Sequence, residues 1–249
     1  MTANAMTSTA LARSIVQSCL DSGAEQVVIA PGSRNAPLSW AFAQAEKAGL
    51  IKIQVRIDER DAGFLALGIA KASNNYVAVI CTSGTAAANF HPAALEALHS
   101  NSKLLIITAD RPERLRKTGS NQTTNQVGIY SLIKTHDLAT SIQIKPLLNG
   151  GPVHLNVQFD EPLLSNVKDS WLSGIKVTPA EYKNKVTGKL EVTTGVLVIG
   201  HDRAGYEARE VNEFASKLNW PVIAEDPISF PQAIAHTPLF LSDEKISLL

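Results

Sequence analysis

One carboxylate, Glu59, stands where a strand pattern changes into a helix pattern. Apolar residues alternate at Ile51, Ile53, Val55 and Ile57 before it, and a Gly/Ala-rich helix pattern follows over about 60–72. Acids in this position occupy the carboxyl end of a strand, where parallel α/β sheets bind ligands. Glu59 could therefore do acid-base chemistry in a crevice, although acids also begin helices simply because they complement the helix dipole.

A small-residue loop follows the next strand pattern, 77–81. It reads Thr82-Ser83-Gly84-Thr85 and lies at the start of a helix, where backbone N–H groups can cradle a phosphate. No Gly-Lys-Ser/Thr follows, so it is not a Walker loop. The stretch Gly200 to Gly205 also follows a strand but lacks G-x-G-x-x-G, which leaves an unrelated nucleotide-binding α/β protein as a weak alternative.

Arginines and polar groups follow two further strand patterns. Ser33 and Arg34 come directly after Pro31-Gly32, and Arg111 opens a polar segment that contains Asn121 and Gln122. A guanidinium presents a planar fork that suits a carboxylate, so these residues form a candidate anion site. The alternative, turn residues with surface charge, is left open by the sequence.

Strands alternate with helices over the first hundred residues, which predicts a doubly wound parallel α/β sheet. Strand patterns cover 27–30, 51–57, 77–81 and 104–108, and helix patterns cover 9–22, 38–48, 60–72 and 86–98. Two short strands are expected near 141–144 and 153–157. Only eight residues separate them, so either they are not parallel neighbours or a crossover helix is missing.

The chain divides into two parts on composition. Residues 1–163 are predicted to form the first domain, the polar stretch 164–194 a linker, and 195–249 the start of a second, incomplete α/β domain. The polar run 110–130 is a long loop, and such loops inside compact domains are usually functional or disordered.

Composition excludes several classes of function. There are 23 basic and 23 acidic residues, so no basic field suggests nucleic acid as a partner. No apolar run reaches the length of a membrane span, and the N-terminus lacks a secretory signal pattern, so a cytoplasmic location is expected. Cys19 and Cys81 are predicted to be buried thiols, no metal-ligand spacing is found, and His154 is expected to be structural.

The motifs occur together in an order that resembles a known family. IAPGSR, DER with G-x-LALG-x-AK, TSGTA-x-AN, TADRP and G-x-NQ are similar to the N-terminal, pyrimidine-binding domain of thiamine-diphosphate enzymes. Within that superfamily they resemble 2-succinyl-5-enolpyruvyl-6-hydroxy-3-cyclohexene-1-carboxylate synthase of menaquinone biosynthesis. The similarity is dense over 27–128 and weaker to 163, and from 195 the chain fits the start of the family's central domain.

The resemblance implies a transferase that decarboxylates 2-oxoglutarate and adds the succinyl carbanion equivalent to isochorismate. Glu59 would hydrogen-bond the aminopyrimidine ring of thiamine diphosphate as the catalytic residue. The substrate side would be formed by Ser33, Arg34, Arg111, Asn121 and Gln122. The cofactor side would be formed by Pro31, Glu59, Thr82, Ser83, Gly84, Thr85 and Asn89.

The family's Gly-Asp-Gly…Asn motif, which holds Mg²⁺ (or Mn²⁺) and the diphosphate, does not occur in these 249 residues. The resemblance therefore implies a truncated chain, a fragment or one half of a split enzyme, inactive alone, whose full-length relatives form homodimers or homotetramers. A non-catalytic interaction module derived from the enzyme is the other alternative.

Overall fold

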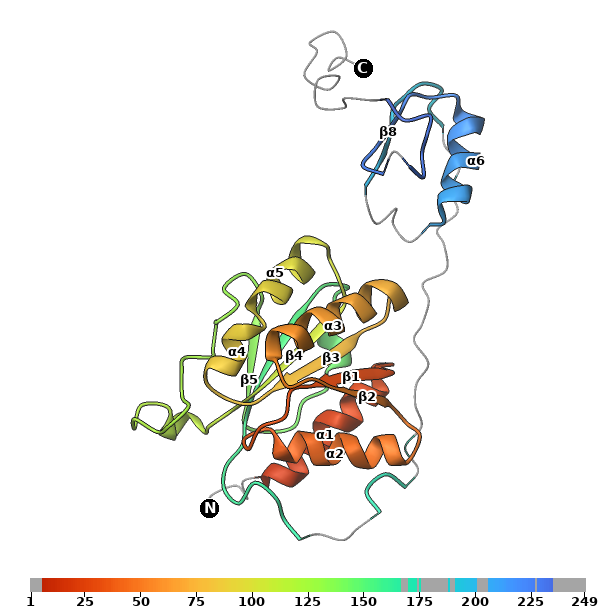
Figure 1. Cartoon of the computed structure of the whole chain (residues 1–249). Coiled ribbons are helices and arrows are strands. Elements are labelled where there is room, and N and C mark those ends of the chain that lie inside the picture. Colours follow the sequence, from red (N-terminus) through yellow and green to blue (C-terminus); the bar gives the residue numbers. More distant parts are fainter. Residues whose placement is uncertain are drawn as a thin grey trace. The chain divides into compact units, whose positions relative to one another are not determined.

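The computed structural model describes residues 6–166, 170–173, 175, 188, 191–200, 206–226 and 228–234. The chain separates into two compact units, Met1–Tyr182 and Lys183–Leu249, and each is described by itself. Figure 1 shows the chain coloured from red at the N-terminus to blue at the C-terminus. In the described part of the chain, no helix is both long and apolar enough to cross a membrane.

The first unit is built on a six-stranded sheet in which every paired neighbour is parallel. The strand order is β2-β1-β3-β4-β6-β5. The central strands β3 and β4 are buried along their whole length, as strands covered on both faces must be. The predicted doubly wound parallel sheet is confirmed. The strands are β1 (Gln26–Ile29), β2 (Lys52–Val55), β3 (Val77–Cys81), β4 (Leu104–Asp110), β5 (Thr135–Leu138) and β6 (Val153–Gln158).

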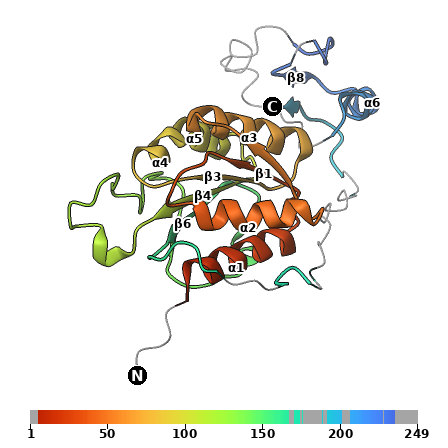
Figure 2. The same cartoon turned by 60° about the horizontal axis from the view of Figure 1, so that its bottom comes forward.

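Helices cover both faces of this sheet, as Figures 1 and 2 show. Helices α1 (Ser8–Asp21) and α2 (Ala36–Lys47) pack on one face, around a core that contains Leu11, Ile15 and Phe42. Helices α3 (Glu59–Ser73), α4 (Thr85–Asn89) and α5 (His91–His99) lie on the other face. The small residues of α3, such as Gly63 and Ala66, let it approach α4 and α5 closely.

The sheet has a topological switch point between β1 and β3. The chain leaves β1 through α2 to the outer strand β2, and it leaves β3 through α4 and α5 to β4 on the other side. The loops after β1 and β3 therefore lie side by side at the carboxyl edge, where open α/β sheets bind ligands. They are so close that a Cβ atom on Gly32 would lie 2.5 Å from Cβ of Thr82.

Two expected elements differ from the structure. The strand expected at 141–144 is wrong: β5 lies earlier, at Thr135–Leu138, and it pairs in parallel with β6. The backbone N–H of Ile144 instead donates to Ser18 Oγ (2.7 Å), and a 3-10 helix, η2 (Lys145–Leu147), follows. Residues 139–152 thus connect two parallel neighbours without an α-helix, and the connection has the length that a crossover needs.

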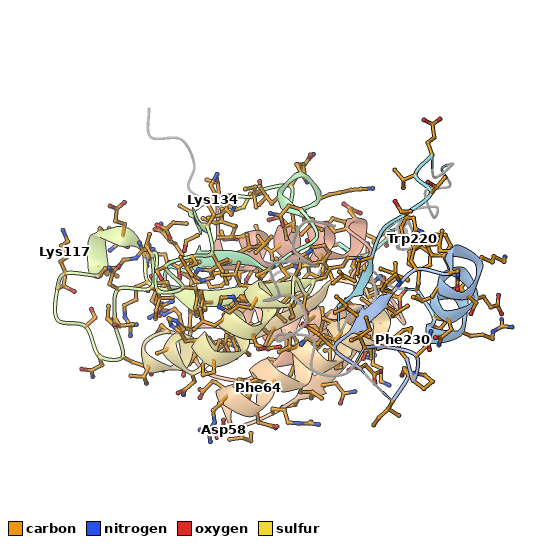
Figure 3. All side chains as sticks on the ribbon, turned by 90° about the horizontal axis from the view of Figure 1, so that it is seen from above. Asp58, Phe64, Lys117, Lys134, Trp220 and Phe230 are labelled. Carbon is orange, nitrogen blue, oxygen red and sulfur yellow. The ribbon has the colours of Figure 1, made fainter. Side chains whose placement is uncertain are left out.

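The helix expected over 86–98 is divided into α4 and α5 at Phe90. Pro92 lies in the first turn of α5, a position where a missing N–H and a fixed φ favour a new helix start. The polar loop after β4 contains one short 3-10 helix, η1 (Glu113–Leu115), and is otherwise irregular up to β5. Figure 3 shows Lys117 of this loop projecting away from the sheet, and Asp58 and Phe64 on the outer side of α3.

Part of the range expected to be a linker packs on the first unit. Side chains of Trp171, Leu172 and Ile175 lie against the core between the sheet and helices α1 and α2, as does Leu163 just before this range. Trp171 Nε1 donates to Gln44 Oε1 of α2 (2.9 Å). The boundary between the two units falls after Tyr182, inside the range 164–194.

The second unit has a small core of its own. Strands β7 (Leu197–Ile199) and β8 (Val222–Ala224) are parallel, and α6 (Ala208–Leu218) connects them. This core contains the buried side chains of Ile199, Ala215, Val222 and Phe230, the last of which is labelled in Figure 3. The weak nucleotide-loop candidate Gly200 to Gly205 falls at 201–205 on residues outside the described ones.

Candidate active site

Glu59 is the first residue of α3 and stands close after the carboxyl end of β2. The preceding Asp58 caps the helix, because its side chain accepts from the N–H of Asp61 (3.1 Å). The half-buried Glu59 carboxylate accepts a hydrogen bond from Asn89 Nδ2 at the end of α4 (3.0 Å). Burial first, and the charge of Glu59 second, raise the pKa of the Cys81 thiol at the end of β3.

The loop 82–85 is held closed by amide side chains. Gly84 has a φ of 81°, which favours glycine, and its N–H donates to Gln126 Oε1 (2.9 Å). Ser83 Oγ donates to the carbonyl of Gln122 (3.0 Å), and Gln122 Nε2 donates to the carbonyl of Ser83 (3.1 Å). Since the Gly84 N–H already has an internal acceptor, it is not available to cradle a phosphate.

Arg34 and Arg111 point into the same region from two loops. Arg34 Nη1 donates to the carbonyl of Phe159 (3.1 Å) and to Glu161 Oε1 (3.2 Å). Arg111 Nη1 donates to Ser83 Oγ and to the Gln122 carbonyl, both at 2.9 Å. Burial, followed by the positive charge of Arg34, lowers the pKa of Arg111. Two guanidinium groups that repel each other form a site that favours an anion.

A buried polar network fixes the strand ends behind Arg111. Asp110 is fully buried. It forms an ion pair with Arg116 Nε (2.9 Å) and accepts hydrogen bonds from Asn156 Nδ2 (3.0 Å) and from the N–H of Arg111 (2.7 Å). Burial raises the pKa of Asp110, and these bonds counteract the rise only in part. Arg116 also pairs with both carboxylate oxygens of Asp137 (2.7 and 2.9 Å). Each charge in the network is paired, as buried charges must be.

The structure brings some of the candidate residues together and leaves others apart. Glu59 contacts Asn89, while Arg111, Ser83 and Gln122 form one bonded group. Thr82 Oγ1 accepts from the N–H of Arg34 (3.3 Å), which connects the loops after β1 and β3. Four candidates are exposed, with no side-chain hydrogen bond in the described part of the chain to the other candidates: Pro31, Ser33, Thr85 and Asn121.

Two residues that the sequence analysis did not name contact the candidates. Gln126 is fully buried and bonds the Gly84 N–H, and Glu161 pairs with Arg34. Gln126 belongs to the same amide-rich run as Gln122, and this run was the one feature of the sequence that could have pointed to Gln126. Glu161 follows β6, but nothing in the sequence connects it to a loop more than a hundred residues earlier.

The polar groups around Glu59 suit a ligand that carries hydrogen-bond donors on a ring. A carboxylate positioned by an amide, with Asn89 as its one hydrogen-bond partner among the described residues, can accept from a protonated ring nitrogen or amino group. A metal is different: among the described residues, no group of three or more His, Cys, Asp or Glu side chains could hold one.

Comparison with known proteins defines the class. Residues 9–129 match the family described as thiamine pyrophosphate enzyme, N-terminal TPP binding domain. Together with the parallel sheet, this match shows that residues 9–129 form a domain of the kind found at the N-terminus of thiamine pyrophosphate enzymes. The alternative of an unrelated nucleotide-binding protein is therefore wrong.

More specifically, the chain is similar to the N-terminal portion of proteins named 2-succinyl-5-enolpyruvyl-6-hydroxy-3-cyclohexene-1-carboxylate synthase. It is 52% identical to the one from Paenarthrobacter aurescens over 89% of the chain and 42% of that protein. The synthase from Nocardioides sp. is 46% identical over 87% and 39%. The one from Saccharopolyspora erythraea is 38% identical over 88% and 44%. The chain thus spans about two fifths of the length of these relatives.

Proposed function

We propose that this chain supplies the pyrimidine-binding part of a thiamine-diphosphate-dependent 2-succinyl-5-enolpyruvyl-6-hydroxy-3-cyclohexene-1-carboxylate synthase. The observation that carries the proposal is that the loop 82–85 is bonded to Arg34 through Thr82 and to Arg111 through Ser83, while Glu59 is bonded to Asn89 of the helix that this loop begins. The similarity to synthases over nearly the whole chain supports it. The whole enzyme would transfer a succinyl unit from 2-oxoglutarate to isochorismate, in the cytoplasm, for menaquinone biosynthesis.

Glu59 is assigned to the cofactor. Its carboxylate would accept a hydrogen bond from the aminopyrimidine ring, and Asn89 would keep that carboxylate oriented. When bound, thiamine diphosphate supplies the electron sink for decarboxylation. The protein's part is to hold or release a proton at a carboxylate oxygen of Glu59, in a half-buried position where acid-base groups act effectively.

Arg34 and Arg111 are assigned to the carboxylates of the substrates. Each has an N–H group held by a main-chain carbonyl, Phe159 for Arg34 and Gln122 for Arg111, so neither guanidinium must be reoriented when a ligand arrives. A preformed pair of charged donors orients an anion at a small cost in entropy. Ser33, Asn121 and Gln122 are proposed to complete the substrate side, while Pro31, Thr82, Ser83, Gly84 and Thr85 line the cofactor side.

The diphosphate end of the cofactor is proposed to be held elsewhere. No described group of residues fits Mg²⁺ or Mn²⁺, so those ions would be bound by the C-terminal part found in the family. We propose that the C-terminal part of a full-length synthase completes the site, within a homodimer or homotetramer. A non-catalytic role for the chain by itself is the second candidate, and the observation that favours it is that no described group of residues could hold a metal ion.

Calorimetry of thiamine diphosphate with the 249-residue chain tests the proposal, with and without a C-terminal chain from one of the relatives. We expect weak, metal-independent binding by the chain alone, and tighter, Mg²⁺-dependent binding with turnover of 2-oxoglutarate and isochorismate in the mixture. Absence of turnover in a mixture that forms a stable complex would contradict the proposed activity and favour the non-catalytic role.

A further inference from the structure

Glu161 places a carboxylate of the protein itself on Arg34. Its Oε1 accepts from Arg34 Nη1 at 3.2 Å, and its Oε2 accepts from the N–H of Leu163 at 3.2 Å. The N–H of Glu161 is in turn held by Asp160 Oδ1 (2.9 Å). The carboxylate is thus anchored at both oxygens and at its own backbone, so it is oriented toward Arg34 before any ligand binds.

The two partners differ in exposure. The Arg34 side chain is 16% exposed, whereas that of Glu161 is 65% exposed. Arg34 keeps a second acceptor, the Phe159 carbonyl, that does not depend on Glu161. If the carboxylate of Glu161 separates from Arg34, water can solvate it, and the Phe159 carbonyl still holds the Arg34 guanidinium. An exposed ion pair of this kind is worth little, so a ligand carboxylate can replace it.

Glu161 also determines the net charge of the arginine pair. Arg34 and Arg111 carry two positive charges, and two other nearby acids, Asp110 and Asp160, already pair with Arg116 and Arg114. With Glu161 ionised, the site offers a net charge of about +1. Without it, the site offers about +2, which favours a dianion over a monoanion because the interaction energy scales with the product of the charges.

We propose that Glu161 is an internal carboxylate that competes with anionic ligands for Arg34 and so tunes the site's selectivity for dianions. The inference rests on the proposed function, since that function assigns Arg34 and Arg111 to substrate carboxylates. It adds a specificity-determining residue, one that contacts the ligand-binding arginine and weakens binding by occupying it.

The test is binding of succinate, a dicarboxylate probe, and of acetate, a monocarboxylate probe, to the 249-residue chain by NMR titration. Glu161→Gln keeps the size of the side chain and removes its charge. The control is Asp160→Asn, which removes one charge from the adjacent residue while Asn Oδ1 can still accept from the Glu161 N–H. Asp160 forms its ion pair with Arg114 and not with Arg34. The control therefore separates direct competition for Arg34 from a general change in the local electrostatic potential.

We expect Glu161→Gln to bind succinate about two- to fivefold tighter than the wild type, the range of one exposed ion pair, and to gain less for acetate. Asp160→Asn should change succinate binding much less. Unchanged or weaker binding by Glu161→Gln, with a wild type that binds, overturns this inference and leaves the proposed anion site intact. An equal gain in Asp160→Asn overturns it too. If neither the wild type nor Glu161→Gln binds succinate, both the inference and the assignment of the arginines fail.

Discussion

At the scale of single residues, side chains from separate elements act in pairs. Glu59 is the first residue of α3 and Asn89 the last residue of α4, and their hydrogen bond is the contact that orients the carboxylate. Arg111 reaches back from the loop after β4 to Ser83, the residue that follows the buried Thr82. Each proposed role depends on such a pair, so each can be tested by changing one member.

Glu59→Gln should reduce turnover of the assembled enzyme by about 10²–10⁴-fold, because an amide cannot exchange the proton that a carboxylate holds. The fold should be unaffected, since the helix cap belongs to Asp58. Steady-state kinetics with a completed site would measure the loss. Asp58→Asn is the matched control, because Asn also caps helices and turnover should stay near that of the wild type. A Glu59→Gln enzyme with wild-type turnover would remove Glu59 from the mechanism.

Arg111→Ala should raise the Michaelis constant for 2-oxoglutarate or isochorismate by roughly 30-fold or more, since losing a desolvated charge-assisted partner costs about 2–5 kcal/mol. Arg114→Ala is the control, because Arg114 lies three residues further on and pairs at the surface with Asp160. Equal kinetics of the two variants would mean that Arg111 is a surface charge without a ligand.

At the scale of elements, the sheet was predictable and the connections were not. Alternating and buried apolar runs identified β1, β2, β3, β4 and β6, because such runs fit a sheet that is covered on both faces. Strand β5 was misplaced, since Thr-His-Asp-Leu carries mostly polar side chains, several of which bond its neighbour β6. Contacts such as Gln126 with Gly84 or Arg34 with Glu161 join residues far apart in the sequence, so no local pattern reveals them.

Gln126 is the residue that joins the loop 82–85 to the sheet. Its Nε2 donates to the Ala109 carbonyl (3.2 Å) and to Asn156 Oδ1 (2.9 Å), while its Oε1 accepts from Gly84. Gln126→Leu should lower the free energy of unfolding by about 1–3 kcal/mol, because buried polar groups lose their partners. It should also accelerate hydrogen exchange at the Gly84 amide.

Urea unfolding and amide exchange of the 249-residue chain would measure these two effects. Gln158→Leu is the control: Gln158 donates to Asp137 Oδ2 (2.9 Å) and is only partly buried, so its loss should spare the Gly84 amide. Slow exchange at Gly84 in Gln126→Leu would show that another contact holds the loop.

At the scale of the whole molecule, burial of polar side chains makes stability depend on pH. His154 in β6 is fully buried between the hydroxyls of Thr108 and Thr135, each 2.9 Å from a ring nitrogen. Thr108 Oγ1 donates to Asn156 Oδ1 (2.8 Å), so it accepts from the Nε2–H of His154. Burial is the main cause that lowers the pKa of His154 to about 3.

This pKa predicts a loss of stability in mild acid. The unfolded chain binds a proton near pH 6.5 and the folded chain does not until about pH 3, so the stabilisation is complete above pH 6.5 and falls as the pH falls. Between pH 7 and pH 5 the free energy of unfolding should drop by about 2 kcal/mol from this group. Urea titrations at a series of pH values would show the slope.

His154→Gln should flatten that slope, whatever its effect on stability at pH 7. His136→Gln is the comparison: burial, with the charge of Lys134, lowers the pKa of His136 too, but this side chain is partly exposed and its effect should be smaller. A wild-type slope in His154→Gln would mean that other groups cause the acid sensitivity.

The two compact units predict where the chain can be cut. The described core of the first unit lies within Met1–Tyr182, and it includes the packing of Trp171, Leu172 and Ile175 on the sheet side that α1 and α2 cover. A chain ending at residue 182 should therefore unfold with the same urea midpoint as the first unit does within the 249-residue chain.

A chain ending at residue 163, the boundary that composition suggested, should have a free energy of unfolding lower by about 2–4 kcal/mol. Three partly buried apolar side chains and the hydrogen bond from Trp171 to Gln44 are removed in it. Trp171→Ala in the longer chain should reproduce a share of that loss. Equal stability of the chains ending at 163 and 182 would mean that residues 164–182 only connect the units.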